Sequence, residues 1–179
     1  ALELNNDIPK IIRENSEKYS LAYDFMNRYY LKVGSMPEIS GLIFVSADSD
    51  GVPRITLSLK LMEMDTVDVN EVVYKLIFLE SGLWTKKFNI LLDGTATSQS
   101  SEKLERIMGL FMNLLPRDSF INLDTVIFYN INESFLVFWW NQAKKAYDSF
   151  GLGTLKHVFL TSNCSSEVFK SMQLQKYSV

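Results

Sequence analysis

Apolar residues recur at helical spacing in the first part of the chain. The pattern begins at Ile8 and resumes between Tyr19 and Tyr29. Spacings of three and four residues place such side chains on one face of a helix. Gly34 and Pro37 are typical of a helix end, so the sequence predicts helices before residue 37 and a change of structure after it.

The pattern that follows is typical of strands. Gly41–Ala47 is a short apolar run, and the Asp50-Gly51 pair after it is a turn signal. Apolar and polar residues then alternate from Pro53 to Leu61, which is the period of a half-buried strand. The sequence therefore predicts a β-hairpin over residues 41–61. Three further apolar runs predict buried strands at 88–92, 125–129 and 157–160.

Helical patterns separate these later strands. Asp68 and Glu71 have the spacing of a capping box, and an apolar period follows them. Further helices are predicted over 104–115, 134–150 and 165–174, and Gly151 is a C-cap signal for the second of these. Strands that alternate with helices favour an α/β fold with a mostly parallel sheet. Because the strands are apolar along their length, we expect helices on both faces of this sheet, with the hairpin as an antiparallel neighbour.

Composition excludes several classes of protein. The chain has 179 residues, of which 47% are hydrophobic, and a formal net charge of −3, so it suits one domain and lacks the basic excess of a nucleic-acid-binding protein. Its single cysteine, Cys164, and single histidine, His157, exclude a disulfide framework and zinc sites with several such ligands, and we expect no metal site. The chain begins without a signal-peptide pattern, and its longest apolar run, 135–140, is too short for a membrane span, which predicts a cytoplasmic protein.

Asp93, His157 and Cys164 are the candidates for catalytic chemistry. Asp93 follows a central strand, where α/β proteins gather their sites, and Cys164 precedes a predicted helix. His157 and Cys164 lie near opposite ends of one short strand, and no second acid accompanies Asp93. Because a nucleophile with a base and an orienting group is missing, we expect no catalytic residue. Asp93 is expected to cap backbone N–H groups of the polar turn after it.

Aromatic residues gather in one strand and in the helix predicted after it. This helix is apolar nearly all round at its start, and such a helix buries two faces. We predict that one face packs on the sheet and that the other lines an apolar pocket together with the helix over 104–115. The residues predicted to line this pocket are Ile107, Phe111, Phe128, Phe135, Phe138 and Trp139. The alternative interpretation is an ordinary aromatic core.

Several strings occur in an order that resembles a known family. They are FMNRY at 25–29, GLIFVSADSDGVPRITLSLKL at 41–61, FNILLDGT at 88–95, TVIFYNIN at 125–132 and HVFLTSNCSSEVFKSMQLQKY at 157–177. Together they resemble the CRAL-TRIO lipid-exchange module of neurofibromin and of its fungal relatives, the Ira-type Ras GTPase-activating proteins. The resemblance covers residues 23–179.

The resemblance implies a CRAL-TRIO-like, mostly parallel α/β sheet covered by helices. Lead-in helices would occupy residues 1–37, and the lipid-binding domain would occupy 38–179. Its cavity would hold a glycerophospholipid under a lid, without catalytic activity or any other cofactor, and the module would associate peripherally with a membrane surface. In a longer protein, a Ras-GAP domain would precede this module, and the C-terminal lid and a pleckstrin-homology-like domain would follow it.

Two other functions stay open at this point. A protein-interaction module of the same fold would have a vestigial cavity, with its aromatic helix docked on a neighbouring domain. A small α/β enzyme would use Asp93 with Cys164 or His157. Co-purified lipid would favour the lipid-binding module, and a fully packed interior would favour the interaction module.

Overall fold

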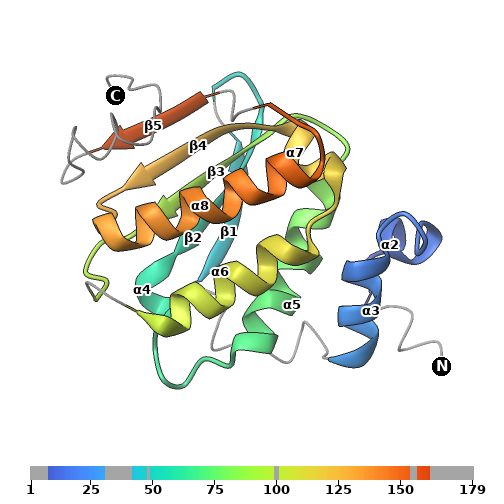
Figure 1. The fold of residues 1–179 in the computed structure, drawn as a ribbon, viewed down its shortest axis with the longest axis horizontal. Coiled ribbons are helices and arrows are strands. Elements are labelled where there is room, and N and C mark those ends of the chain that lie inside the picture. Colours follow the sequence, from blue (N-terminus) through green and yellow to red (C-terminus); the bar gives the residue numbers. More distant parts are fainter. Residues whose placement is uncertain (1–7, 31–41, 48, 99–100, 154–156, 162–179) are drawn as a thin grey trace.

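The computed structural model describes residues 8–30, 42–47, 49–98, 101–153 and 157–161, and their strands form one five-stranded sheet (Figure 1). The strands are β1 (Ile43–Ala47), β2 (Pro53–Ser58), β3 (Phe88–Asp93), β4 (Leu123–Tyr129) and β5 (His157–Thr161). β1 runs antiparallel to β2, whereas β2, β3, β4 and β5 are parallel neighbours. The predicted α/β class and mostly parallel sheet are confirmed, and the hairpin supplies the antiparallel edge strand.

Helices connect the parallel strands. Between β2 and β3 lie α4 (Leu59–Met62), α5 (Val69–Glu80) and the 3₁₀ turn η3 (Ser81–Leu83); between β3 and β4 lie α6 (Glu102–Leu114) and α7 (Arg117–Asn122); between β4 and β5 lies α8 (Glu133–Ser149). Among the described residues, α2 (Lys10–Glu14) and α3 (Ser20–Arg28) precede the sheet. The predicted helix over 165–174 and Cys164 lie outside the described residues, and the domain boundary at residue 37 stays a prediction.

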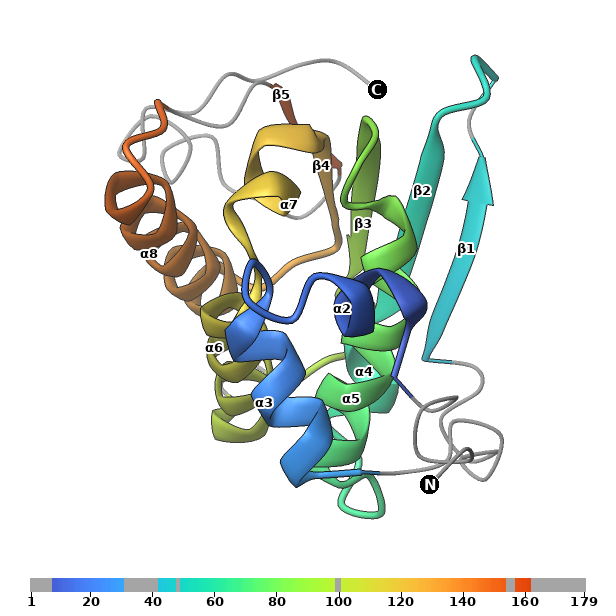
Figure 2. The same cartoon turned by 90° about the vertical axis from the view of Figure 1, so that its right-hand side faces the viewer.

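The strands stand in the sheet in the same order as in the chain, β1-β2-β3-β4-β5. When each crossover has the same hand and each new strand is added on the same edge, every connecting helix falls on one face. Figures 1 and 2 show α5, α6 and α8 on one side of the sheet, and α3 packs against α5 and α6. For the described residues, the prediction of helices on both faces is therefore wrong.

The predicted strand from Pro53 to Leu61 ends three residues early. β2 stops at Ser58, and the chain turns into the short helix α4. Leu59 and Met62 are buried while Leu61 is 37% exposed, which is a helical and not an alternating pattern. Over so few residues, the helical spacing and the alternating spacing of a strand predict nearly the same buried positions. The burial of Met62 distinguishes them and favours the helix.

Two helix ends use the local signals that the sequence contains. The Asp68 carboxylate accepts a hydrogen bond from the backbone N–H of Glu71 over 3.1 Å, as expected of an N-cap. At the end of α8, Gly151 has φ +68°, and the Leu152 N–H donates to the Tyr147 carbonyl. This is the Schellman motif, in which glycine takes the left-handed position.

Candidate functional site

The strand register divides the central residues of the sheet between two faces. Leu57, Leu92 and Phe128 are paired across β2, β3 and β4, and each is almost fully buried. Leu57 and Leu92 also line a cavity together with residues of α6 and α8, so this row faces the helices. Because side chains alternate along a strand, the residues between them face the opposite side.

The residues predicted to line a lipid pocket lie in the layer between the sheet, α6 and α8. Five of the six are buried, and Phe138 is half-buried. Phe128 and Trp139 are in ring contact, with centroids 5.2 Å apart. Phe138 lies over Gly109 of α6, where its ring would be 3.7 Å from an added Cβ atom. The sequence therefore placed these residues in one apolar layer.

The space inside this layer is small. Its cavity has a volume of about 20 Å³, and Phe111 and Trp139 are the members of the predicted set that line it. A cavity needs about 10–15 Å³ to hold one water molecule, whereas pockets for small ligands measure about 300–1,000 Å³. In the described conformation, neighbouring side chains fill the layer, and an acyl chain enters it only if α8 or α6 moves.

The sequence analysis did not single out one polar lining residue, Glu80. It is 1% exposed at the end of α5, and its side chain lines the same cavity. Burial raises the pKa of Glu80 to about 8, and the nearby Trp84 indole acts in the opposite direction. The sequence contains a signal for the burial of Glu80. This residue follows Leu76 by four positions and Ile77 by three, so it lies on the same buried face of the helix.

The opposite face of the sheet has a different character. Thr56, Leu91 and Ile127 are register partners across β2, β3 and β4. Leu91 and Ile127 are half-buried, so both keep accessible surface. Two residues earlier on the same strands, Asn89 and Thr125 are register partners and face the same side of the sheet. The Asn89 carboxamide oxygen accepts a hydrogen bond from the Thr125 N–H over 3.1 Å. The middle row of this face thus contains two apolar side chains, Leu91 and Ile127, next to Thr56, and a polar row lies beside it. Thr56, Asn89 and Thr125 are themselves buried, at 8%, 8% and 9% exposure.

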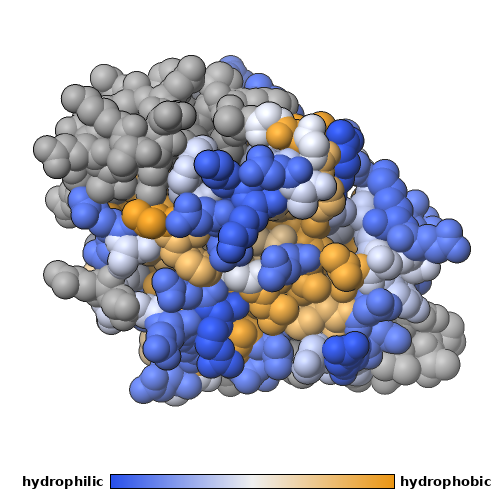
Figure 3. Space-filling model, in the orientation of Figure 1, coloured by the Kyte–Doolittle hydropathy of each residue, from blue (hydrophilic) through white to orange (hydrophobic). Residues whose placement is uncertain are grey.

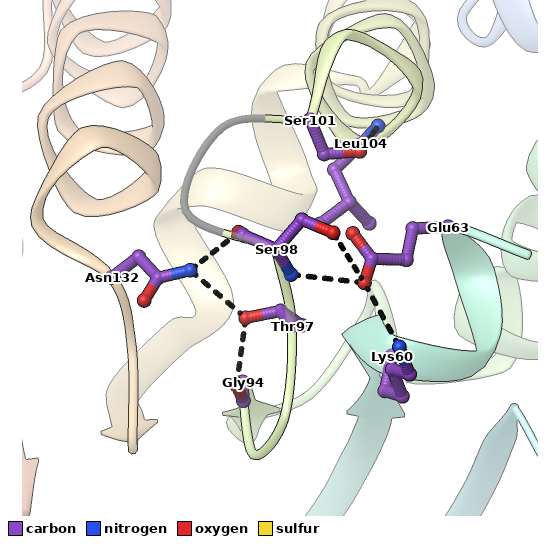
Figure 4. Close-up of polar contacts among 8 residues, drawn as sticks. All are labelled: Lys60, Glu63, Gly94, Thr97, Ser98, Ser101, Leu104 and Asn132. Carbon is purple, nitrogen blue, oxygen red and sulfur yellow. Dashed lines mark hydrogen bonds and ion pairs between the residues drawn. The ribbon is translucent and has the colours of Figure 1, made fainter.

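A polar crevice of about 640 Å³ lies at the carboxyl ends of β3 and β4, between the segments 94–97 and 130–134. The Asn132 side chain spans it, donating to the Thr97 hydroxyl over 3.1 Å and to the Ser98 carbonyl (Figure 4). Ser98 in turn donates through its N–H to Glu63, which also pairs with Lys60 over 3.5 Å. The two strand-to-helix turns are therefore fastened to each other and to α4.

Close backbone packing shapes this crevice. Gly94 donates to the Tyr129 carbonyl, and a Cβ atom at Gly94 would lie 2.8 Å from the Asn130 carbonyl oxygen. Asn130 itself has φ +51° and donates through its side chain to Thr95 over 2.9 Å. Glu133 is the charged residue among those that line the crevice, so its walls offer hydroxyl and amide groups and no cationic side chain.

Of the three candidates for catalysis, the two that lie within the described residues, Asp93 and His157, are not brought together. Asp93 accepts a hydrogen bond from the Thr95 N–H over 3.0 Å, so it caps the turn as predicted. His157 is paired with Thr125 at the start of β5, at the opposite end of the strands from Asp93, and Cys164 lies outside the described residues. The described part of the chain contains no group of three acids, cysteines or histidines close enough to hold a metal ion. Nothing in this geometry indicates catalysis.

Fold and site together define an α/β protein with an open, mostly parallel sheet and one helix-covered face. No family model matches the chain. It is 28% identical, over 96% of its length, to the inhibitory regulator protein IRA2 of Saccharomyces cerevisiae. It is 25% identical, over its whole length, to the inhibitory regulator protein IRA1 of the same yeast. These similarities confirm the relationship to Ira-type regulators that the sequence strings indicated.

The chain spans only 6% of the length of each of these relatives. It therefore matches one segment of a much larger protein. No helix among the described residues has the length and apolar character needed to cross a bilayer.

Proposed function

We propose that this chain is a non-catalytic, glycerophospholipid-binding module of a regulator that activates the GTPase of Ras. The similarity to the two yeast inhibitory regulators supports the regulatory context. The resemblance of the strings to CRAL-TRIO modules supports lipid binding. In this proposal, the protein is cytoplasmic, reaches membranes peripherally, and carries Ras-GAP and pleckstrin-homology-like domains beside this module.

The observation that carries the proposal is the apolar row on the face of the sheet that the described helices leave uncovered. Leu91 and Ile127 stand side by side in this row and are only half-buried. Removing apolar surface from water stabilises a complex by about 25 cal/mol per Å². An acyl chain laid across this row would gain that stabilisation without any rearrangement of the helix layer.

The layer that contains Phe111, Phe138 and Trp139 is the second location for an acyl chain. It has the apolar character that lipid needs, but its cavity measures about 20 Å³. Lipid in this layer would therefore have to separate α8 from α6. The two locations lie on opposite faces of the sheet, so substitutions can distinguish them.

The test uses three matched substitutions to aspartate at incompletely buried apolar positions. Ile127→Asp alters the uncovered face, Phe138→Asp alters the layer between α6 and α8, and Val137→Asp alters the outer surface of α8, where Val137 is 43% exposed. The purified variants are checked for folding by circular dichroism. Glycerophospholipid extracted per mole of protein is then measured by mass spectrometry, with and without prior incubation with phosphatidylcholine vesicles.

We expect lipid in the wild type and the Val137 variant, and a loss of at least tenfold in the Ile127 variant. A loss confined to the Phe138 variant would move the lipid to the layer between α6 and α8. Absence of lipid from the folded wild type, before and after incubation, would exclude lipid binding.

Protein interaction is the second candidate function, and two observations favour it. The helix layer is packed, apart from its small cavity. Figure 3 shows apolar surface over the carboxyl-terminal half of α6, surrounded by hydrophilic groups, and Leu110 and Leu114 of this helix are half-buried. Apolar patches bordered by polar residues are typical of protein contacts. A Leu110→Asp, Leu114→Asp variant that loses binding to a neighbouring domain of the full-length protein, while the wild type holds no lipid, would favour this function.

A further inference from the structure

A row of polar residues crosses the face of the sheet that the described helices leave uncovered. It consists of successive register partners on β1 to β4, namely Ser46, Arg54, Asn89 and Thr125. The last three each stand three positions before the residue of their strand that faces the helices, and side chains alternate along a strand, so they face the opposite side. Ser46 shares that side because it stands directly opposite Arg54. The members on β3 and β4 are buried, whereas Ser46 and Arg54 are half-buried, so the accessible part of the row lies on β1 and β2.

Ser46 and Arg54 each have a polar atom that is enclosed without a partner. These atoms are the hydroxyl oxygen of Ser46 and the Nε nitrogen of Arg54. The two terminal nitrogens of the Arg54 guanidinium are not enclosed, and they too have no partner among the described residues. Because such donors are ordinarily paired, Arg54 lacks the acceptor that a guanidinium in a protein usually has.

The charges on this face give it two different ends. Arg54 is the charged residue of the polar row, at the amino ends of the parallel strands, and Asp93 stands on the same face at their carboxyl ends. Asp124, whose carboxylate accepts from the Thr125 hydroxyl over 3.1 Å, is paired with Lys87 over 3.7 Å, so its charge is already balanced. An anion on this face is therefore favoured beside Arg54 and disfavoured toward Asp93.

The apolar part of the face begins within reach of Arg54. Leu91 stands on the neighbouring strand, two positions beyond the register partner of Arg54. With strands about 4.8 Å apart and a rise of about 3.3 Å per residue, the backbones at these two positions are about 8 Å apart. A glycerophospholipid carries its phosphate and its acyl chains on one glycerol unit, so its anionic and apolar parts lie at a comparable separation. Arg54 on one side and Leu91 with Ile127 on the other therefore match the two parts of one lipid.

We propose that Arg54, beside the unpaired hydroxyl of Ser46, binds the phosphate of a glycerophospholipid whose acyl chain lies on Leu91 and Ile127. This inference rests on the proposed function and adds a head-group site to it. The planar guanidinium offers parallel N–H donors to phosphate oxygens, which gives charge-assisted hydrogen bonds. The lipid lies with its phosphate at the amino ends of the parallel strands and its acyl chain directed toward their carboxyl ends. A lipid without phosphate, such as diacylglycerol, gains no stabilisation from this site.

The experiment incubates the whole chain with vesicles that contain phosphatidylcholine and diacylglycerol with the same acyl chains. The protein is re-isolated, and both lipids are measured per mole of protein by mass spectrometry. Arg54→Gln removes the charge, Arg54→Lys keeps the charge without the planar fork, and Arg106→Gln, at an exposed position of α6, is the matched control. Because Arg54→Gln removes no described side-chain hydrogen bond or ion pair, we expect this variant to fold, which circular dichroism checks.

We expect the wild type and the Arg106 variant to enrich phosphatidylcholine over diacylglycerol by about tenfold or more relative to the vesicles, which is the effect of one hydrogen bond to a charged group. Arg54→Gln should lose this enrichment and hold the two lipids in the ratio of the vesicles. Arg54→Lys should retain part of the enrichment, because a point charge still attracts phosphate.

The inference fails, and lipid binding stands, if the wild type holds lipid without enrichment or if the folded Arg54→Gln variant enriches phosphatidylcholine as the wild type does. Loss of both lipids from the folded Arg54→Gln variant would also contradict it, because a phosphate site does not act on diacylglycerol. Absence of both lipids from the folded wild type would exclude the proposed function and this inference together.

Ser46→Ala covers the case in which Arg54→Gln does not fold. It removes the hydroxyl opposite Arg54 and leaves the charge in place. We expect the enrichment of phosphatidylcholine to fall by about threefold, the effect of one neutral hydrogen bond. An enrichment equal to that of the wild type in both Ser46→Ala and Arg54→Lys would overturn the head-group site.

Discussion

The ring of Phe128 on β4 meets the indole of Trp139 on α8 nearly at a right angle, with centroids 5.2 Å apart and an interplanar angle of 82°. Both side chains are buried, at 0% and 4% exposure. Edge-to-face pairs of this kind contribute about 0.5–1.5 kcal/mol beyond the burial of their area. This contact therefore attaches α8 to the centre of the sheet.

Replacing Trp139 with alanine should lower the free energy of unfolding by about 3–5 kcal/mol, because it leaves a large cavity beside Phe128. The neighbouring residue Trp140 is only half-buried, so Trp140→Ala should cost clearly less. Urea denaturation followed by circular dichroism measures both values. Equal losses in the two variants would show that the contact between α8 and the sheet does not depend on Trp139.

Glu80 should make the stability of the fold depend on pH. Its pKa is about 8 in the folded protein against an ordinary value of 4.5, so between these values the unfolded chain releases a proton that the folded chain keeps. Stability is then complete below about pH 4.5 and declines as the pH rises toward 8, at up to about 1 kcal/mol per pH unit, after which this contribution levels off.

Glu80→Gln should remove this decline, because its amide does not ionise. Urea unfolding midpoints measured from pH 5 to pH 9 provide the comparison. Glu17→Gln, at an exposed position, serves as the matched control and should follow the wild-type curve. Parallel curves for the wild type and Glu80→Gln would mean that Glu80 is not a neutral acid in the folded state.

Asp68→Ala should destabilise the protein by about 1 kcal/mol, because it removes the carboxylate that accepts from the Glu71 N–H at the start of α5. Asp65→Ala is the control, since Asp65 is exposed and precedes the helix. Thermal unfolding at neutral pH compares the two. A loss as large in the Asp65 variant would point to a general effect of charge and not to capping.

Gly151→Ala should cost about 1 kcal/mol, because the residue has φ +68°, where a Cβ atom is strained. No atom lies within 4 Å of an added Cβ at this position, so the cost isolates the backbone conformation. Gly82→Ala is the matched control, because Gly82 also has open space around it but no positive φ. Equal stability of the two variants would exclude strain at the end of α8.

Local signals explain what the sequence predicted correctly in the fold. The cap at Asp68, the turn at Gly151 and the strands of the sheet each depend on a few neighbouring residues. The order of strands depends on contacts far apart in the chain, so the apolar run of β3 did not reveal that the described helices lie on one face. The short helix α7, after Pro116, was missed because six residues carry too little periodicity to identify a helix.

The sequence predicted which residues of the candidate site are apolar and close together, but not the shape of the site. Apolar character placed Phe111 and Trp139 in one layer, but it could not give the volume left between them, which depends on packing. Glu80 went unnoticed because an acid at the end of a helix is ordinarily solvated. The crevice at Gly94 was visible only as a polar turn, since its shape depends on the approach of Asn130 from another strand.

The sequential order of the strands has a consequence for biosynthesis. Each described strand after the first pairs with the one synthesised just before it, so none of these five strands waits for a distant partner. Pairing of this kind shortens the loops that must close during folding. The sheet can grow by one edge as the chain leaves the ribosome, with α5, α6 and α8 each docking before the next strand arrives. Once the chain has emerged from the ribosome as far as Gly153, it already contains β1 to β4 and the described helices that connect them. β5 then pairs with the open edge of β4.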